Sequence, residues 1–207
     1  MNTRALAAPL LVLVSALGAL PWSMESAPVD ATAPAEAKAG TYRVDGGHST
    51  AWFGIRHLGV ANFYGRFNSI QGEFTYDPDD AEACKVKVGI DPDSVDTNSG
   101  GRDDHVKGPD FLDVEKFPLM GFESTSVAFG EDGMLAVTGN LILHGQSREV
   151  TIDVEIVGAG DTAFRDYRCG MEARFTVSRS DYGMEAMLDK LGDEIRFTLS
   201  LEGIIQE

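Results

Sequence analysis

The chain is poor in basic residues, and this shortage limits its partners. It has 17 lysines and arginines against 33 aspartates and glutamates, which gives a formal net charge of −16. A chain with this charge repels nucleic acid and anionic lipid surfaces at long range. The composition therefore argues against nucleic-acid binding, and the acidity otherwise indicates a well-solvated surface.

Cysteine is also scarce, with only Cys84 and Cys169 in the sequence. Each lies in an alternating run, in phase with apolar neighbours, so both side chains should point into the core. They are either two buried free thiols or, in an exported protein, a disulfide pair. The sequence leaves both alternatives open, because pairing depends on a Cα separation that it does not supply. Neither cysteine has a second ligand at metal-binding spacing.

The four histidines form no close pair of the kind that binds zinc, and the sequence has no Gly-x-Ser-x-Gly motif. These absences argue against a metal site and against a hydrolase of the Ser-His-Asp type. By strand phase, His48 should face outward or cap the entry of its strand, and His57 should point inward near one end of its strand. His144 should lie in a hairpin turn, whereas His105 belongs to a charged loop.

Long apolar runs are confined to the N-terminus. Residues 1–20 carry one charge, Arg4, ahead of an almost unbroken apolar run. This is the pattern of an export signal, and the run is too short for a comfortable membrane span. We predict a signal peptide over residues 1–23, without a clear cleavage site, and a disordered linker rich in Ala, Pro and Glu over residues 24–40. The folded domain should occupy residues 41–207, in the periplasm or outside the cell.

From residue 42 onward the dominant pattern is a period of two, which is typical of half-buried strands. About eight such runs are separated by short turns, and the phase breaks near Asn68–Ser69. Because the links are short, neighbouring strands should pair antiparallel. We predict an all-β fold, namely an eight-stranded antiparallel up-and-down barrel with one or two short helices. A β-sandwich is the competing architecture.

A polar stretch over residues 99–124 interrupts the strands, and long ordered loops often carry function. Its charged head and apolar tail suggest a lid or mouth on a container. Residues 102–107 could form one helical turn, with Ser99 as its cap. Residues 184–191 have helical composition and could plug one end of the barrel or pack as an ordinary short helix. The apolar face of this second helix would contain Met184, Met187, Leu188 and Leu191.

The size of an eight-stranded barrel limits what it can hold: its interior is filled by side chains or admits one slender ligand. The inward face is aromatic and aliphatic, so a long apolar tail fits, whereas a polar metabolite would leave buried groups unpaired. The predicted tail-lining residues are Phe53, Ile55, Phe63, Phe67, Val86, Val88, Ile90, Phe111, Phe122 and Leu141. The predicted head-group or mouth residues are His57, Arg102, Asp103 and His105. The alternative for the last three is that they only pin the loop.

Several segments resemble the YceI-like family of bacterial exported lipid-binding proteins, and the resemblance covers residues 42–202. They include YRVDGGHSTAWFGIRHLGV, GRFNSIQGEF, GNLILHGQSREVTI, SRSDYGM and LGDEIRFTLSLEG. What the resemblance implies is a lipocalin-like, eight-stranded barrel that holds a polyisoprenoid or a similar long amphiphile in its bore.

Three functions remain open at this point. The first is a soluble, non-enzymatic carrier or store for a long-chain isoprenoid lipid, such as a polyisoprenoid, an isoprenoid quinone or its precursor. The second is an enzyme acting on such a lipid, with His57, His105 and Asp103 as acid–base candidates. The third is a filled barrel without a ligand. No cofactor or metal is expected, and a homodimer and a transient contact with a membrane or membrane protein are further expectations.

Overall fold

A computed structural model describes residues 37–130 and 133–206. The predicted signal peptide and most of the predicted linker lie outside the described residues. The described chain forms an 11-stranded sheet and the helix α1 (Gly100–Lys107). The strands are β1 (Gly40–Val44), β2 (Thr50–His57), β3 (Ala61–Phe67), β4 (Ile70–Tyr76), β5 (Lys85–Ile90), β6 (Val95–Asp96), β7 (Met120–Phe129), β8 (Leu135–Leu143), β9 (Gln146–Asp161), β10 (Tyr167–Ser178) and β11 (Leu191–Ile205).

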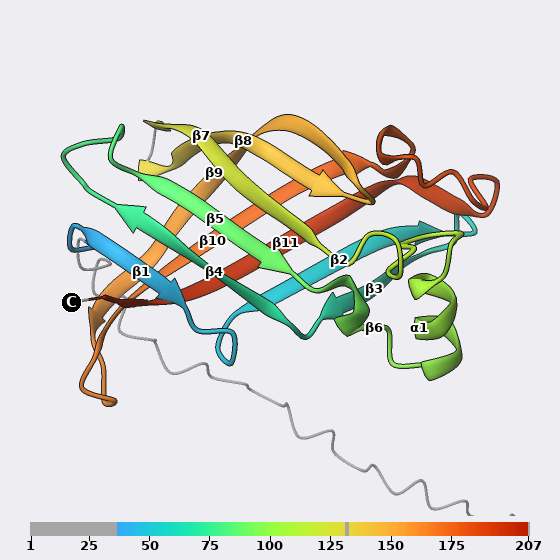
Figure 1. Ribbon diagram of the computed structural model, residues 1–207, viewed down its shortest axis with the longest axis horizontal. Helices are drawn as coiled ribbons and strands as arrows, with labels where there is room; N and C mark the ends of the chain where they lie inside the picture. The colour runs from blue at the N-terminus through green and yellow to red at the C-terminus, as the bar shows by residue number, and fades with distance from the viewer. Residues whose placement is uncertain (1–36, 131–132, 207) are drawn as a thin grey trace, which may run out of the picture. The chain divides into compact units, whose positions relative to one another are not determined.

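The sheet closes on itself as a barrel (Figure 1). Antiparallel pairing of β1 with β11 completes a ring in the order β1-β4-β5-β7-β8-β9-β10-β11. The same β11 also pairs with β2, which pairs with β3, and β3 pairs with β6. The prediction of an eight-stranded antiparallel up-and-down barrel is confirmed, and the sandwich alternative is wrong because no second layer is formed by the described strands.

Three of the long strands are bent, which is why eleven segments make an eight-stranded barrel. The segments β1 and β2, β3 and β4, and β5 and β6 each follow one another along the barrel wall, with breaks at residues 45–49, 68–69 and 91–94. The break at residues 68–69 coincides with the predicted phase change. At the third break Pro92 has no N–H for the strand ladder, and Asp91 accepts a hydrogen bond from the Asp93 backbone N–H at 2.9 Å.

The end of the barrel around β1 is packed solid with aromatic rings. Tyr42 is fully buried and stacks on Phe74, with ring centroids 5.0 Å apart, and its hydroxyl donates to the Lys38 carbonyl oxygen at 2.6 Å. Lys38 also lies over the Tyr167 ring, and Ala37 is buried. The described end of the predicted linker therefore packs on the barrel, and this closes one end of the bore.

At the opposite end α1 confirms the helical turn predicted over residues 102–107 (Figure 1). The backbone N–H groups of Arg102 and Asp103 both donate to the Ser99 carbonyl oxygen at 2.9 Å. Ser99 occupies the capping position as predicted, but its side chain makes no capping hydrogen bond. None of the described helices has the length and apolar character needed to cross a membrane.

The second predicted helix, over residues 184–191, is wrong. A short 3-10 turn (Arg179–Tyr182) is followed by turns up to residue 190, and β11 begins at Leu191. Gly183 has a φ of 78° and Met187 a φ of 56°, so the backbone there leaves the helical region. Tertiary hydrogen bonds from a buried arginine, described below, hold this loop open against its helical propensity.

Candidate functional site

Two apolar cavities lie in series inside the barrel. The mouth cavity, of about 320 Å³, lies among β2, β3, α1 and the loop over residues 183–190. The inner cavity, of about 70 Å³, lies deeper between β5, β7, β8, β10 and β11. The volume of the mouth cavity is at the lower end of the range of roughly 300–1,000 Å³ that is usual for ligand sites.

All ten predicted tail-lining residues lie on the wall of one of these cavities. The mouth cavity is lined by Phe53, Ile55, Phe63, Phe67 and Phe111. The inner cavity is lined by Val86, Val88, Ile90, Phe122 and Leu141. The period-two pattern thus identified the inward faces, whereas contact with a lipid stays a prediction.

A constriction separates the two cavities. Met120, Leu143 and Phe197 line both of them, so their side chains form the boundary. All three side chains are buried, and they belong to the alternating runs from which the lining residues were predicted. The alternation therefore pointed to these three residues, although they were not among the predicted lining residues. The bore is therefore two chambers with a waist rather than one uniform tube.

Glycine makes room for an aromatic ring in the mouth cavity. Gly65 pairs with Phe53 across β2 and β3, and a Cβ at Gly65 would lie 2.4 Å from the Phe53 Cζ atom. Such a distance is far inside van der Waals contact, so only glycine fits opposite this ring. Phe53 in turn packs against Phe67, with centroids 5.4 Å apart.

Arg102 reaches from α1 onto the wall of the mouth cavity. Its guanidinium lies 4.5 Å from the Phe63 ring centroid, and it donates from Nε to Thr97 Oγ1 at 2.9 Å and from Nη2 to the Thr97 carbonyl oxygen at 2.6 Å. Among the described residues no carboxylate pairs with it. The cation is held in place by a neutral hydroxyl, a carbonyl and a ring, and the hydroxyl in turn donates to the Asp103 carboxylate.

Asp103 was predicted as a head-group or mouth residue, but it is not among the residues that line the mouth cavity. Its Oδ1 atom accepts hydrogen bonds from the Thr97 backbone N–H at 2.8 Å and the Thr97 hydroxyl at 2.5 Å. Thr97 is 3% exposed, so the carboxylate satisfies a buried backbone donor. Asp103 fixes the start of α1 against β6, which is the pinning alternative for this residue.

The two histidines predicted at the mouth both line the mouth cavity. His57 is the last residue of β2, and it is exposed rather than enclosed because the strand ends there. His105 is also exposed; its Nε2 lies 3.3 Å from Asp110 Oδ2 and its ring packs edge-on against Phe111. Because exposed side chains form part of its wall, the cavity opens at this end of the barrel.

The other two histidines lie where the sequence placed them, His48 by strand phase and His144 by a turn signal. His48 is exposed, and His144 lies in the turn between β8 and β9. The Nδ1 atom of His144 lies 2.9 Å from the Tyr182 carbonyl oxygen, so Nδ1 carries the proton and donates. Its Nε2 atom is buried without a hydrogen-bond partner, and its ring packs on Phe117. His144 thus ties this turn to the segment that bounds the mouth.

Arg179 is the main residue of the site that was missed. Its side chain is 1% exposed, and it lines the mouth cavity. It donates to three main-chain carbonyl oxygens, those of Met184 at 2.6 Å, Gly192 at 3.0 Å and Leu191 at 3.4 Å. Burial lowers the pKa of the guanidinium, and the nearby Asp193 carboxylate opposes that effect. The alternating pattern could have identified Arg179, because it falls on the inward face when the alternation of β10 is extended past the end of the strand.

Both cysteines are buried free thiols, which is one of the two alternatives that the sequence left open. Burial raises the pKa of Cys169 to about 12 and also raises the pKa of Cys84. The Cys84 sulfur accepts from the Asp77 backbone N–H at 3.3 Å. Neither thiol lines either cavity. A thiol in such surroundings is inert, so the cysteines pack rather than react.

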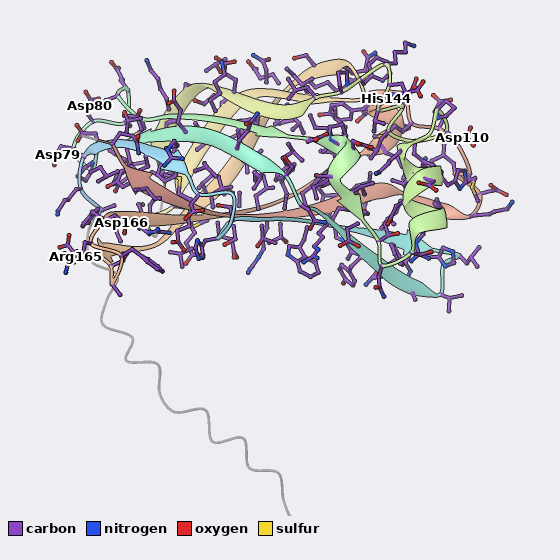
Figure 2. The ribbon with its side chains drawn as sticks, turned by 60° about the horizontal axis from the view of Figure 1, so that its bottom comes forward. Asp79, Asp80, Asp110, His144, Arg165 and Asp166 are labelled. Carbon is purple, nitrogen blue, oxygen red and sulfur yellow. The ribbon has the colours of Figure 1, made fainter. Side chains whose placement is uncertain are left out.

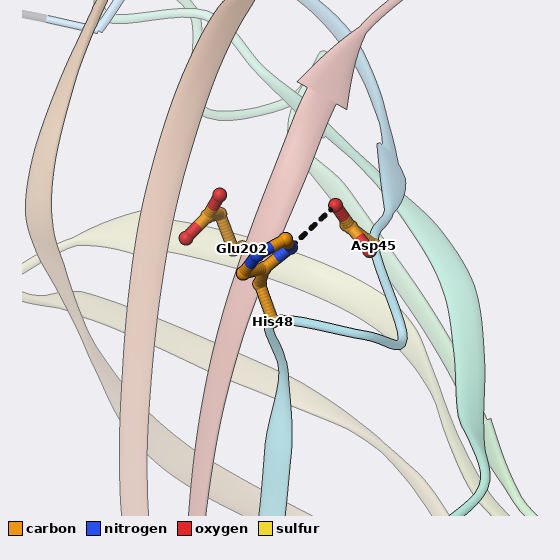
Figure 3. Close-up of side chains that lie close together, drawn as sticks. All are labelled: Asp45, His48 and Glu202. Atoms are coloured by element: carbon orange, nitrogen blue, oxygen red, sulfur yellow. Dashed lines mark hydrogen bonds and ion pairs between the residues drawn. The ribbon is translucent and has the colours of Figure 1, made fainter. Parts of the chain in front are cut away.

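One group of side chains has the composition of a metal site. Potential ligand atoms of Asp45, His48 and Glu202 lie within 4.8 Å of one another (Figure 3). However, Nη1 of Arg168 donates to Asp45 Oδ2 at 2.8 Å and to Glu202 Oε1 at 2.5 Å. Arg168 also pairs with Asp166, which lies at the end of the barrel opposite Asp110 (Figure 2). The guanidinium already compensates these carboxylates and would repel a cation, so this is an ion-pair network.

Comparisons with known proteins agree with this geometry. Residues 42–203 match the YceI-like domain family. The UPF0312 protein PA0423 of Pseudomonas aeruginosa is 42% identical over 173 residues, which are 83% of this chain and 90% of that protein. The Campylobacter jejuni YCEI protein has a similar structure, with a TM-score of 0.65 and 28% identity, covering 74% of this chain and 91% of that one. A polyisoprenoid binding domain from Saccharophagus degradans shares the fold at 16% identity, with a TM-score of 0.61, covering 82% of this chain and 100% of that one.

Proposed function

The chain belongs to the YceI-like domain family, and from its cavities we propose that it binds a long-chain isoprenoid lipid and carries or stores it in the barrel interior. The observation that carries the proposal is the pair of apolar cavities, whose charged or titratable lining residues are His57, Arg102, His105 and Arg179 in the mouth cavity and Glu172 alone in the inner cavity. The inner cavity and the waist offer hydrocarbon contacts, whereas Arg102 and His105 lie at the mouth. An amphiphile with one polar end and one long apolar end matches this order.

The free energy of transferring the tail does not distinguish one lipid from another, so selectivity between lipids should come from contacts at the mouth. A tail of about forty carbons would gain on the order of 30 kcal/mol on leaving water, at about 0.8 kcal/mol per methylene. Measured affinities saturate near −18 to −21 kcal/mol, so this sum cannot appear as binding. Such a lipid normally resides in a membrane, where its tail is already out of water, and transfer into the barrel is close to neutral for the tail. Contacts of the head group with Arg102, His105 and His57 then decide loading and release.

The ligand class is supported by similarity and by the shape of the cavities. The Saccharophagus degradans domain with this fold is described as polyisoprenoid binding. A branched, flexible chain suits a bore whose waist contains Met120, because a methionine side chain adapts to irregular contacts. The apolar run over residues 1–20 further supports export, so we place this carrier in the periplasm or outside the cell.

An enzyme acting on the lipid is the weaker alternative. It would require His57, His105 and Asp103 to converge as an acid–base set. Asp103 instead accepts from Thr97 and lies off the cavity wall, and His105 lies beside Asp110 at the exposed rim. A non-catalytic binding role therefore fits the arrangement better.

Native mass spectrometry tests the proposal. Protein purified without delipidation should carry a retained lipid, and delipidated protein should take up a polyprenol or an isoprenoid quinone added in detergent. Val88→Trp should abolish uptake, because Val88 lines the inner cavity and is 6% exposed. Val157→Trp is the matched control, since Val157 is 53% exposed on β9. A clean apo mass for the wild-type protein after both treatments would contradict the proposal.

A further inference from the structure

The β2–β3 hairpin differs in charge from the rest of this acidic chain. Residues 46–72 contain no aspartate or glutamate, although the whole chain carries 33 of them. The same segment contains Arg56 and Arg66 and two of the four histidines. The long-range repulsion of anionic surfaces expected from the net charge is therefore weakest along this hairpin.

The tip of the hairpin is apolar and exposed. Val60 is 81% exposed and Leu58 is 56% exposed. A hydrogen bond of 2.7 Å from the Leu58 backbone N–H to the Lys190 carbonyl oxygen joins this turn to the loop that carries Met187 and Leu188, which are 38% and 44% exposed. We call Leu58, Val60, Met187 and Leu188 the apolar tip. Exposed apolar side chains gathered on two adjoining loops mark a contact surface.

Two arginines beside the tip share one neutral partner. Arg56 Nη1 lies 3.4 Å from Asn62 Oδ1, and Arg196 Nη2 lies 2.7 Å from the same oxygen. Neither guanidinium forms an ion pair with a carboxylate in the described part of the chain. Two cations held together by an amide oxygen are costly without an anion, and guanidinium groups match phosphate oxygens in geometry. This arginine pair is thus complementary to a phosphate.

The apolar tip is continuous with the opening of the mouth cavity. His57 directly precedes Leu58 and lines the cavity, as does Met187. The other end of the barrel carries acidic turns, including Asp79 and Asp80, which Figure 2 shows at the end opposite His144. At physiological salt the Debye length is about 8 Å, so charges on that end contribute little at the tip.

We propose that this end of the barrel docks on a phospholipid bilayer containing anionic phospholipids. The apolar tip enters the head-group layer, and Arg56 and Arg196 take lipid phosphates. Asp104, Asp110, Glu185 and Asp189 are exposed at the same end. Insertion of the apolar tip therefore provides the contact, and the arginine pair provides the preference for anionic lipid. This inference rests on the proposed function for its purpose, because docking in this orientation places the cavity mouth against the source of the lipid.

Vesicle flotation of the full chain tests docking separately from lipid retention. Vesicles of phosphatidylcholine alone and of phosphatidylcholine mixed with phosphatidylglycerol serve as probes. Leu58→Asp combined with Val60→Asp should weaken binding to both kinds of vesicle by about tenfold or more, because the tip then carries two charges. Arg56→Glu combined with Arg196→Glu should remove the preference for phosphatidylglycerol, a loss of about thirtyfold, because two basic residues near the surface contribute about 1 kcal/mol each.

Two control variants test whether added negative charge at any exposed position weakens vesicle binding. Val157→Asp and Arg165→Glu make the same chemical changes at exposed positions away from the tip and should leave binding unchanged (Figure 2 labels Arg165). Any vesicle binding through the N-terminal apolar run is common to all variants. The test therefore depends on the difference in vesicle binding between the tip variants and the controls. Hydrogen exchange should show vesicle-dependent protection of residues 58–61 but not of residues 157–161. Equal flotation of wild type and tip variants, or protection elsewhere alone, would overturn docking, while native mass spectrometry independently reports lipid retention.

Discussion

The Nη1 atom of Arg179 donates a 2.6 Å hydrogen bond to the main-chain oxygen of Met184, at the mostly apolar wall of the mouth cavity. Through this bond a buried cation shapes the loop over residues 183–190 and thereby one side of the cavity opening. Transfer of a guanidinium from water costs several kcal/mol, and hydrogen bonds from a charged donor to carbonyl oxygens offset that cost. The residue is thus part of the architecture of the mouth.

Replacing this cation should loosen the mouth. Arg179→Met keeps an unbranched side chain but leaves the carbonyl oxygens of Met184 and Gly192 without their donors. We expect the free energy of unfolding in urea to fall by about 2–6 kcal/mol, at roughly 1–3 kcal/mol for each of the two unsatisfied buried groups. Lipid retention in native mass spectrometry should fall as well. Arg174→Met, at a side chain that is 74% exposed, is the control, and equal stability of the two variants would refute this role.

Arg102 should affect ligand retention more than stability. Arg102→Ala removes the cation over Phe63, a contact that contributes about 0.5–1 kcal/mol at an exposed site. We expect a shift of the melting temperature of only a few degrees, together with a clear loss of retained lipid in native mass spectrometry. Arg165→Ala at the opposite end is the control (Figure 2). Retention equal to that of the control would assign Arg102 to loop packing alone.

Widening the waist should change which lipids enter. Met120→Ala removes a side chain that borders both cavities and should destabilise the fold by about 2–5 kcal/mol. The same change opens the inner cavity to a tail, so the distribution of bound isoprenoid lengths should shift toward longer chains. Competition between short and long polyprenols, read by native mass spectrometry, measures the shift. An unchanged distribution in a folded variant would show that the waist does not limit tail length.

The ion-pair network of Arg168 should make stability depend on acid pH. Hydrogen bonds from His48, Gly47 and Arg168 lower the pKa of Asp45, and hydrogen bonds from Arg168 and Thr162 lower that of Asp166. A carboxyl group with a depressed pKa in the folded state stabilises the protein above its unfolded pKa of about 3.9 and loses that contribution as the pH falls through the folded value.

The stability of the wild-type protein should therefore decline as the pH falls below about 4. Arg168→Met raises both carboxyl pKa values, so it should be less stable at neutral pH and should show a shallower decline. Urea unfolding followed by circular dichroism over this pH range measures both slopes, with Arg165→Met as the control. Parallel curves for wild type and Arg168→Met would exclude the network as the origin of acid sensitivity.

The barrel was predictable because its signals are local. Alternation along residues 135–143 and 195–201 determines which side chains face inward. The turns between consecutive strands are too short for a parallel crossover, so these strands pair antiparallel. The helical turn over residues 102–107 follows from composition for the same reason. Nine of the ten predicted lining residues came from this phase, including residues as far apart as Phe53 and Leu141, whereas Phe111 came from the loop over residues 99–124.

What the sequence could not supply depends on contacts between distant segments. Residues 184–191 have helical composition, but hydrogen bonds from Arg179 to Met184 and Leu191 impose turns instead. Asp103 has the chemistry of a mouth residue, yet the buried backbone N–H of Thr97 holds its carboxylate. The waist depends on how three strands approach one another, which alternation within each strand does not encode.

The aromatic packing around Tyr42 seals the bore at the end away from α1. A molecule occupying both chambers can therefore enter and leave only where α1, the hairpin and the loop after β10 meet. Its hydrocarbon end must go in first, and its polar end must come out first. If the proposed lipid is the molecule bound, a receiving partner meets its polar group before its hydrocarbon tail.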